Sequence, residues 1–181
     1  MINKKIFKSC FSILSFLGTV GLMTNRSALA LPSYFKLPTS LAVQAATTAV
    51  ETCKNQGYEV TATVVNAEGR IQAVVRGDEA TPHTIENSFN KAYSVVTLGP
   101  VQKVDSTEAI RKSMVPNPFP IGDLSLPPVP LAGLTFNPGG LAIRYDSKII
   151  AGLGVSGAPA GTVDQGCAQK GIDKIQAELA K

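Results

Sequence analysis

The strongest candidate for chemistry in this sequence is His83, the one histidine of the chain. It follows Thr81 and Pro82, a pair typical of a helix start, so its ring is expected in a first helical turn. The unpaired N–H groups of such a turn favour anions. His83 could ligate a metal or a haem iron, with a nearby lysine or arginine pairing with acidic groups of the ligand. The simpler interpretation is an exposed polar residue, because one histidine cannot build a metal site by itself.

Motifs of the common enzyme classes are missing from the sequence. There is no H-E-x-x-H, no C-x-x-C, no P-loop and no G-x-S-x-G. Residues 152–157, GLGVSG, match the dinucleotide-binding pattern, but they end a predicted hairpin strand, so tight packing explains their glycines better. Arg76-Gly77-Asp78 is too short to indicate adhesion, and Asp78 fits a turn after a strand.

Residues 1–30 have the pattern of a secretory signal peptide. Three lysines precede an apolar stretch at 11–23, and Ala28-Leu29-Ala30 forms an A-x-A cleavage pattern. The apolar stretch is shorter than the roughly 20 residues of a membrane span, although an uncleaved anchor is the alternative. We therefore expect an exported protein, periplasmic or secreted, with a single mature domain over residues 31–181.

Export changes the expected state of the cysteines. Without the signal segment the chain keeps Cys53 and Cys167, an even pair in an oxidising compartment. Both lie in predicted helices, so a disulfide is possible if those helices are neighbours. Two separate buried thiols are the alternative, because the sequence does not give the distance that a bridge requires.

The net charge of +4 arises entirely from the signal segment. Four of the 17 basic residues fall within residues 1–30, which contain no acid, and the remainder balances the 13 acidic residues. A neutral mature domain argues against nucleic acid as a partner.

The first half of the mature chain predicts a helix, a hairpin and a second helix. The helix covers 39–56, capped by Thr39 or Ser40 and ended by Gly57. Alternating β-branched residues at 58–66 and 70–76 predict the hairpin, and Tyr58, Val60, Ala62 and Val64 share one face. The second helix runs from 82 to about 97. Its predicted buried face consists of Ile85, Phe89, Ala92 and Val96.

The second half predicts a short helix, an irregular stretch, another hairpin and a last helix. Asp105 and Glu108 resemble a capping box for a helix to about residue 113. The proline-rich stretch 114–138 also carries many apolar residues, which indicates an ordered loop over an apolar surface. Strands at 140–146 and 148–155 form a hairpin around Asp146-Ser147, and Thr162 and Gln165 resemble a capping box for a helix to about 179.

This element order predicts an α+β fold. Two hairpins imply a largely antiparallel sheet, and the helices must cover one or both of its faces. Strands and helices do not alternate as βαβ units, which argues against a dinucleotide-binding doubly wound fold.

Two stretches resemble the GlcG/HbpS family of haem-binding-like proteins. They are residues 63–96, TVVNAEGRIQAVVRGDEATPHTIENSFNKAYSVV, and residues 137–171, NPGGLAIRYDSKIIAGLGVSGAPAGTVDQGCAQKG. The resemblance extends from about Leu41 to Ile175, almost the whole mature domain. It implies a profilin-like α/β/α sandwich that often assembles into homo-oligomers, with the first and last helices close enough for a Cys53–Cys167 disulfide.

The resemblance also implies a haem cofactor and a set of site residues. Exported members bind haem, and some are linked to haem breakdown, iron binding and sensing through a membrane kinase. By position, His83 falls where exported members often carry a histidine, and Lys91 to Ser94 fall on a family segment whose hydroxyl residue contacts haem. For a bound haem, His83 would ligate the iron, and Lys91 and Arg76 could reach the propionates from either side. Phe89 and Tyr93 would supply a flat contact. Ser94 replaces the threonine that the family prefers at this position. Two other functions stay open: an enzyme that degrades haem or acts on a small organic acid, and a non-catalytic sensor or partner-binding domain.

Overall fold

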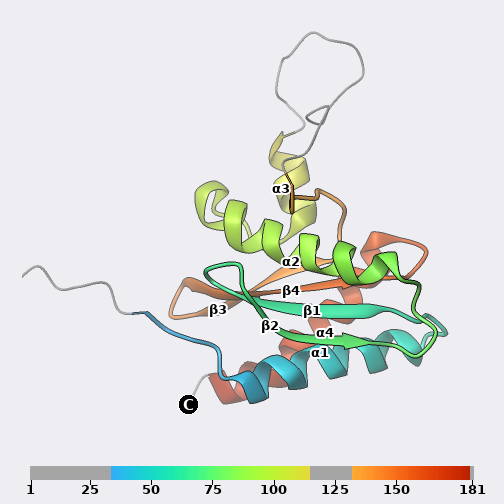
Figure 1. Cartoon of the computed structure of the whole chain (residues 1–181). Coiled ribbons are helices and arrows are strands. Elements are labelled where there is room, and N and C mark those ends of the chain that lie inside the picture. The colour runs from blue at the N-terminus through green and yellow to red at the C-terminus, as the bar shows by residue number, and fades with distance from the viewer. Residues whose placement is uncertain (1–33, 115–131, 180–181) are drawn as a thin grey trace, which may run out of the picture. The chain divides into compact units, whose positions relative to one another are not determined.

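Four antiparallel strands in the order β2-β1-β4-β3 organise the fold, with helices on both faces (Figure 1). The computed structural model describes residues 34–114 and 132–179. The predicted signal segment 1–30 and most of the proline-rich stretch 114–138 lie outside the described residues. The predicted α+β class with helices on an antiparallel sheet is confirmed.

The two predicted hairpins supply all strands of this sheet. β1 (Thr61–Asn66) pairs with β2 (Ile71–Arg76), and β3 (Gly140–Tyr145) pairs with β4 (Lys148–Ser156). Asp146 and Ser147 take positive φ angles of 45° and 63°, which is the two-residue turn that the twist of a hairpin favours. β1 then pairs with β4, so hairpins far apart in sequence share the sheet centre.

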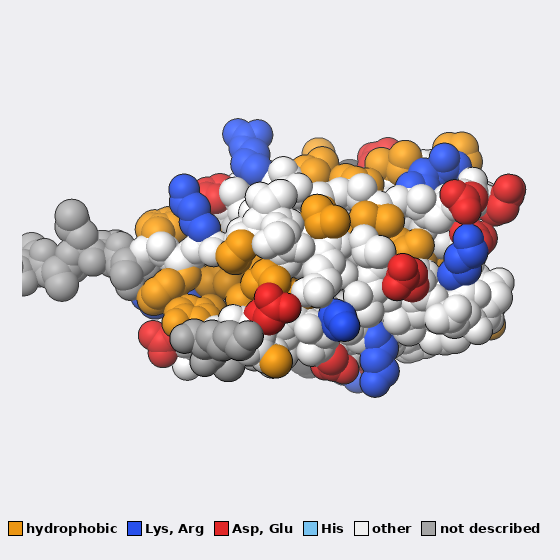
Figure 2. Space-filling view, turned by 90° about the horizontal axis from the view of Figure 1, so that it is seen from below, with side chains coloured by type: hydrophobic (Ala, Val, Ile, Leu, Met, Phe, Trp, Pro, Cys, Tyr) orange, Lys and Arg blue, Asp and Glu red, His pale blue; other side chains and the backbone are white. Residues whose placement is uncertain are grey.

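One face of the sheet packs against α1 (Thr39–Lys54) and α4 (Gly161–Leu179). Val60, which directly precedes β1, and Ala62 and Val64 of β1 point into this core, as predicted. Alanines of α1 and Gly171 of α4 let the two helices approach closely, since an added Cβ at Gly171 would clash with the Ala45 carbonyl oxygen. The outer surface of this layer carries charged side chains of both signs scattered among apolar ones (Figure 2).

The other face is covered by α2 (His83–Gln102), with α3 (Thr107–Met114) beside it. α2 continues past its predicted end at residue 97, through Pro100, and stops where Lys103 adopts a left-handed conformation. Gly152 and Gly154 of β4 contact the α2 backbone, and side chains there would clash with the carbonyl oxygens of Ala92 and Ser88. The GLGVSG stretch thus serves helix–sheet packing.

The predicted buried face of α2 is partly wrong. Ala92 and Val96 are buried, but Ile85 is 45% exposed and Phe89 is only partly buried. The buried residues of α2 include Thr84, Ser88, Lys91, Ser94 and Val95 instead. Polar groups can occupy buried positions here because they bond to hydroxyl groups on β1 and to the carboxylate of Asp164 on α4. The periodicity of apolar residues does not reveal such partners.

The predicted side-chain caps are also wrong. The N-cap position of α1 is Pro38 and carries no side-chain bond. α4 begins at Gly161, ahead of Thr162, and the Ala160 carbonyl accepts from the Val163 N–H. Main-chain turns do the capping at both helices.

The start of α3 differs from its predicted capping box in one residue. Ser106 Oγ accepts from the Ala109 N–H at 3.0 Å, which makes Ser106 the capping residue. Asp105 instead pairs with Arg144 of β3, with 2.6 Å between Oδ1 and Nε. The Asp105 carboxylate thus forms an ion pair with a guanidinium, and the hydroxyl of Ser106 caps the helix.

Candidate functional site

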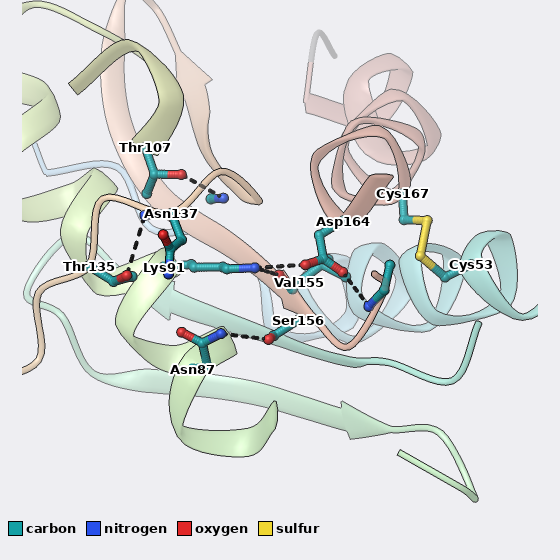
Figure 3. Close-up of polar contacts among 12 residues, drawn as sticks. Cys53, Asn87, Lys91, Thr107, Thr135, Asn137, Val155, Ser156, Asp164 and Cys167 are labelled. Atoms are coloured by element: carbon teal, nitrogen blue, oxygen red, sulfur yellow. Dashed lines mark hydrogen bonds and ion pairs between the residues drawn. A yellow bond between two sulfur atoms is a disulfide. The ribbon is translucent and has the colours of Figure 1, made fainter. Parts of the chain in front are cut away.

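A buried ion pair joins α2 to α4 next to the end of strand β4 (Figure 3). Lys91 Nζ lies 2.7 Å from Asp164 Oδ2, and the two side chains are only 2% and 3% exposed. Nζ also donates to the carbonyl oxygen of Val155 at 2.8 Å, and Asp164 Oδ1 accepts from the Ala158 N–H at 3.0 Å. Such bonds are what a charge pair needs in order to stay buried.

Burial shifts both members of this pair toward their neutral forms. Desolvation lowers the pKa of the Lys91 ammonium, and the attraction of Asp164 opposes that shift. Desolvation likewise raises the pKa of the Asp164 carboxyl, and Lys91 together with backbone N–H groups opposes it. A buried, charge-paired group beside a cavity is a frequent mark of a functional site.

Two consecutive glycines, Gly139 and Gly140, let the backbone pass close to this ion pair. At Gly139, where φ is +123°, an added Cβ would lie 2.8 Å from Lys91 Nζ and 2.9 Å from Asp164 Cβ. Gly140 follows, and its N–H donates to Thr107 Oγ1 at 3.1 Å (Figure 3). A larger residue at Gly139 would push the strand away from the ion pair.

Above the ion pair lies a cavity of about 450 Å³, which we call the polar pocket. Its lining joins α2, α3, the strand end of β4 and the first turn of α4. The residues are His83, Asn87, Lys91, Arg111, Asn137, Pro138, Ser156, Gly157, Ala158, Ala160, Gly161, Thr162 and Asp164. Asn87 Nδ2 donates to Ser156 Oγ at 2.8 Å across its floor (Figure 3).

A second cavity of about 450 Å³, the apolar groove, lies on the other flank of α2, against the edge strand β2. Its lining residues are Thr63, Ile71, Val74, Pro82, Ile85, Glu86 and Phe89. Ile71 is 56% exposed, Val74 42% and Ile85 45%. Large apolar side chains gathered in one open groove are typical of a binding surface.

The structure divides the predicted ligand residues between these two cavities. His83 and Lys91 line the polar pocket, whereas Phe89 lines the apolar groove. His83 is exposed, and its Nδ1 lies 3.2 Å from Thr81 Oγ1. Lys91 is held in the interior by Asp164, so its predicted contact with a propionate stays a prediction that requires this ion pair to open.

Arg76 lies at the end of β2 and is exposed. Its guanidinium donates to the carbonyl oxygen of Ala80 in the loop before α2. It follows Val74 by two residues and so shares a strand face with that groove residue.

Tyr93 and Ser94 are consecutive residues of α2, about one turn beyond Phe89. The Tyr93 ring stacks on Phe89 with 5.6 Å between the centroids, which extends the apolar strip away from the groove. Ser94 is fully buried, and its hydroxyl donates to the Asn90 carbonyl and accepts from the Thr135 N–H, both at 2.7 Å. Direct contact of Ser94 with a ligand therefore stays a prediction that needs the 132–138 loop to move.

Sequence reasoning missed Asp164, Arg111 and Asn87. One signal for Asp164 was available: Lys91 precedes the buried Ala92 on the same helix, and a buried lysine needs an acidic partner. Nothing local marks Arg111 or Asn87, because their common position exists only after α2, α3 and β4 have packed.

Cys53 of α1 and Cys167 of α4 are joined by a disulfide, with 5.6 Å between their Cα atoms (Figure 3). Neither cysteine lines either cavity, and both belong to the core of the α1–α4 layer. Within residues 34–114 and 132–179, no group of three His, Cys, Asp or Glu side chains is placed to hold a metal ion. Over the same ranges, no helix combines the length and apolarity needed to cross a membrane.

Comparison with known proteins gives a family and a set of related structures. The family model described as haem degrading protein HbpS-like matches residues 37–173. The crystal structure of HbpS is 27% identical, covers 81% of this chain and 94% of its own, and superposes with a TM-score of 0.67.

More distant structures share the fold. The Klebsiella pneumoniae protein ORFY is 22% identical, with 83% and 99% coverage of this chain and its own and a TM-score of 0.66. A structure described as a PduOC:heme complex is 22% identical, with 77% and 94% coverage and a TM-score of 0.59. No curated protein matches.

Proposed function

We propose, from the premise that this chain belongs to the HbpS-like family, that the protein binds haem in the apolar groove between α2 and β2. The observation that carries the proposal is the row of exposed apolar side chains, Ile71, Val74 and Ile85, in one groove. A porphyrin is broad, flat and mostly apolar, so it gains most from an open apolar surface. The stacked rings of Phe89 and Tyr93 extend that surface along α2.

The polar edge of haem also has a partner at this groove. Arg76 shares the β2 face with Val74 and is exposed. A guanidinium has five N–H donors, so its bond to the Ala80 carbonyl leaves others for a propionate. We assign Arg76 the propionate contact, ahead of the interior Lys91.

His83 is the residue that we assign to the iron. It directly follows Pro82 of the groove, it is exposed, and the chain has no other imidazole. Its ring lines the polar pocket, so ligation requires the ring to leave Thr81 and turn toward the groove. Bound haem supplies an iron centre and the visible absorption by which binding is measured.

Titration of the purified protein with hemin tests this proposal. We expect a Soret band with the wild type and at least about tenfold weaker binding by Val74→Asp, because the substitution puts a carboxylate against the ring. Val43→Asp on α1 is the matched control, since Val43 is 46% exposed on the opposite side of the sheet. Equal affinities of the two variants would exclude the groove, and no Soret band with the wild type would exclude haem.

The ligand assignment has its own variant. His83→Ala should shift or weaken the Soret band while circular dichroism stays unchanged, because the side chain is exposed. An unchanged spectrum and affinity would instead point to an oxygen ligand, for which Tyr93 is better placed than the buried Ser94.

Haem degradation is the second candidate, favoured by the description of the matching family. Incubating the hemin-loaded protein with a reductant should then release iron and opened tetrapyrrole faster than hemin alone. A stable Soret band under the same conditions would leave binding, transport or sensing as the function.

The place of action is part of this proposal. The basic, apolar and A-x-A pattern of residues 1–30 supports export and cleavage after Ala30. Mass spectrometry of the exported protein should give a chain starting at Leu31. A chain that keeps Met1 would contradict cleavage.

A further inference from the structure

We propose that the polar pocket is a separate site for a small organic carboxylate, with Arg111 as its anchor. This inference goes beyond haem binding, and it rests on the chemistry of the pocket lining. The two cavities share no lining residue, and α2 lies between them.

The charge balance of the pocket favours an anion. Lys91 and Asp164 compensate each other at 2.7 Å, so together they add no net charge. Arg111 is exposed and has no hydrogen-bond or ion-pair partner among the described residues. A permanent cation on the wall of a polar cavity attracts an anion, and the planar guanidinium fits a carboxylate with two parallel hydrogen bonds.

The remaining lining limits the size and charge of that anion. Asn87, Asn137, Ser156 and Thr162 offer neutral donors and acceptors around Arg111. The single positive charge of Arg111 balances one carboxylate, whereas a doubly charged phosphate requires more than one positive charge. A cavity of about 450 Å³ suits a molecule of a few carbon atoms with a hydroxyl or similar group beside the carboxylate.

The test uses acetate, lactate and inorganic phosphate as probes, followed by NMR at constant ionic strength. Both carboxylates should give saturable shifts of the Ser156 and Thr162 amide signals, with lactate binding more tightly because its hydroxyl can bond to the neutral groups. Arg111→Gln should weaken lactate binding at least about tenfold, since it removes a charge-assisted contact. Lys112→Gln, which removes the neighbouring charge outside the pocket, should leave the affinity unchanged.

Three results would overturn the proposal. They are no saturable shift with either carboxylate, tighter binding of phosphate than of lactate, and equal effects of the Arg111 and Lys112 substitutions. Hemin titration of Arg111→Gln separates this site from the haem proposal. Unchanged hemin affinity supports two sites, and a lost Soret band would mean that the pocket belongs to the haem site. If the wild type takes lactate and no hemin, the haem proposal alone is wrong.

Discussion

The two faces of the sheet are held by different kinds of contact. On the α1–α4 side, the core is almost wholly apolar and rich in alanine, and the disulfide links its two helices. On the α2 side, the apolar cluster is small, centred on Val65, Ala92 and Val96. Hydroxyl pairs and the Lys91–Asp164 ion pair fill the rest. Both candidate sites adjoin α2, the helix whose contacts are directional and whose cover of the sheet is incomplete.

Strand β1 shows how one sequence produces both faces. Val60, Ala62 and Val64 point to the α1–α4 core, and the intervening Thr61 and Thr63 point to α2. Thr61 Oγ1 lies 2.7 Å from Thr84 Oγ1, and Thr63 Oγ1 lies 2.7 Å from Ser88 Oγ. The apolar face depends on volume, while the polar face depends on the exact matching of donors to acceptors. Different substitutions should therefore damage each face.

The largest effect is expected from removing the disulfide on the apolar side. Cys53 and Cys167 are 114 positions apart, and closing so long a loop stabilises the folded state by about 4–5 kcal/mol in the chain-entropy account. The double variant Cys53→Ala/Cys167→Ala should lose about that much free energy of unfolding in urea. Adding reductant should lower the wild-type midpoint and leave the variant unchanged; a wild type insensitive to reductant would contradict the prediction.

Breaking the ion pair should have a comparable or slightly smaller effect on the polar side. Asp164→Asn leaves Lys91 buried without its counter-charge, which costs about 3–5 kcal/mol. The double variant Lys91→Met/Asp164→Leu should recover most of that loss, because it leaves no buried charge. Equal stability of the single and double variants would mean that the pair is not the source of the effect.

The same single variant should acquire a pH dependence. Burial lowers the pKa of Lys91, and without Asp164 nothing of opposite charge counters that shift. Between the lowered folded pKa and the unfolded pKa, the unfolded state binds more protons, so stability rises with pH in this window. Urea unfolding of Asp164→Asn should give a higher midpoint at pH 9 than at pH 7. A flat or falling profile, after subtracting that of the wild type, would contradict this.

A hydroxyl pair should matter less than the ion pair. Thr63→Val removes one partner of Ser88, but the Ser88 hydroxyl still donates to the Ile85 carbonyl. We expect a loss of about 1 kcal/mol. Adding Ser88→Ala should cost less in this background than in the wild type, and strictly additive losses would show that the two hydroxyls are not coupled.

The smallest effect on stability is expected at the edge of the polar side. Ile71 is 56% exposed in the apolar groove, so Ile71→Ser should change the free energy of unfolding by no more than about 0.5 kcal/mol. Hemin affinity should nevertheless fall in the same variant. A large loss of stability would show that the groove is a packing surface and not a binding one.

The sequence predicted those parts of the fold that depend on neighbours along the chain. The β1–β2 and β3–β4 hairpins follow from local alternation and from turn residues such as Asp146 and Ser147. Apolar spacing alone predicts Ile85 and Phe89 in the core, because spacing cannot show what lies opposite a helix face. The partners that bury Thr84 and Lys91 instead are 23 and 73 positions away, on β1 and α4.

The candidate site was less predictable for the same reason. His83 was evident as the one histidine, whereas Arg111 and Asn137 join it only through the packing of α2, α3 and the loop before β3. The predicted ligand residues His83, Lys91 and Phe89 all lie on α2, but they line two different cavities. The sequence places them on one helix and does not show which side of that helix faces which cavity.

The disulfide between α1 and α4 also affects how the protein responds to proteolysis. All strands of the sheet, together with α2 and α3, lie between Cys53 and Cys167 in the sequence. A single cut anywhere in that interval leaves one cysteine on each of the two pieces. The disulfide therefore keeps the pieces covalently linked. A nicked molecule would therefore migrate as one species until it is reduced.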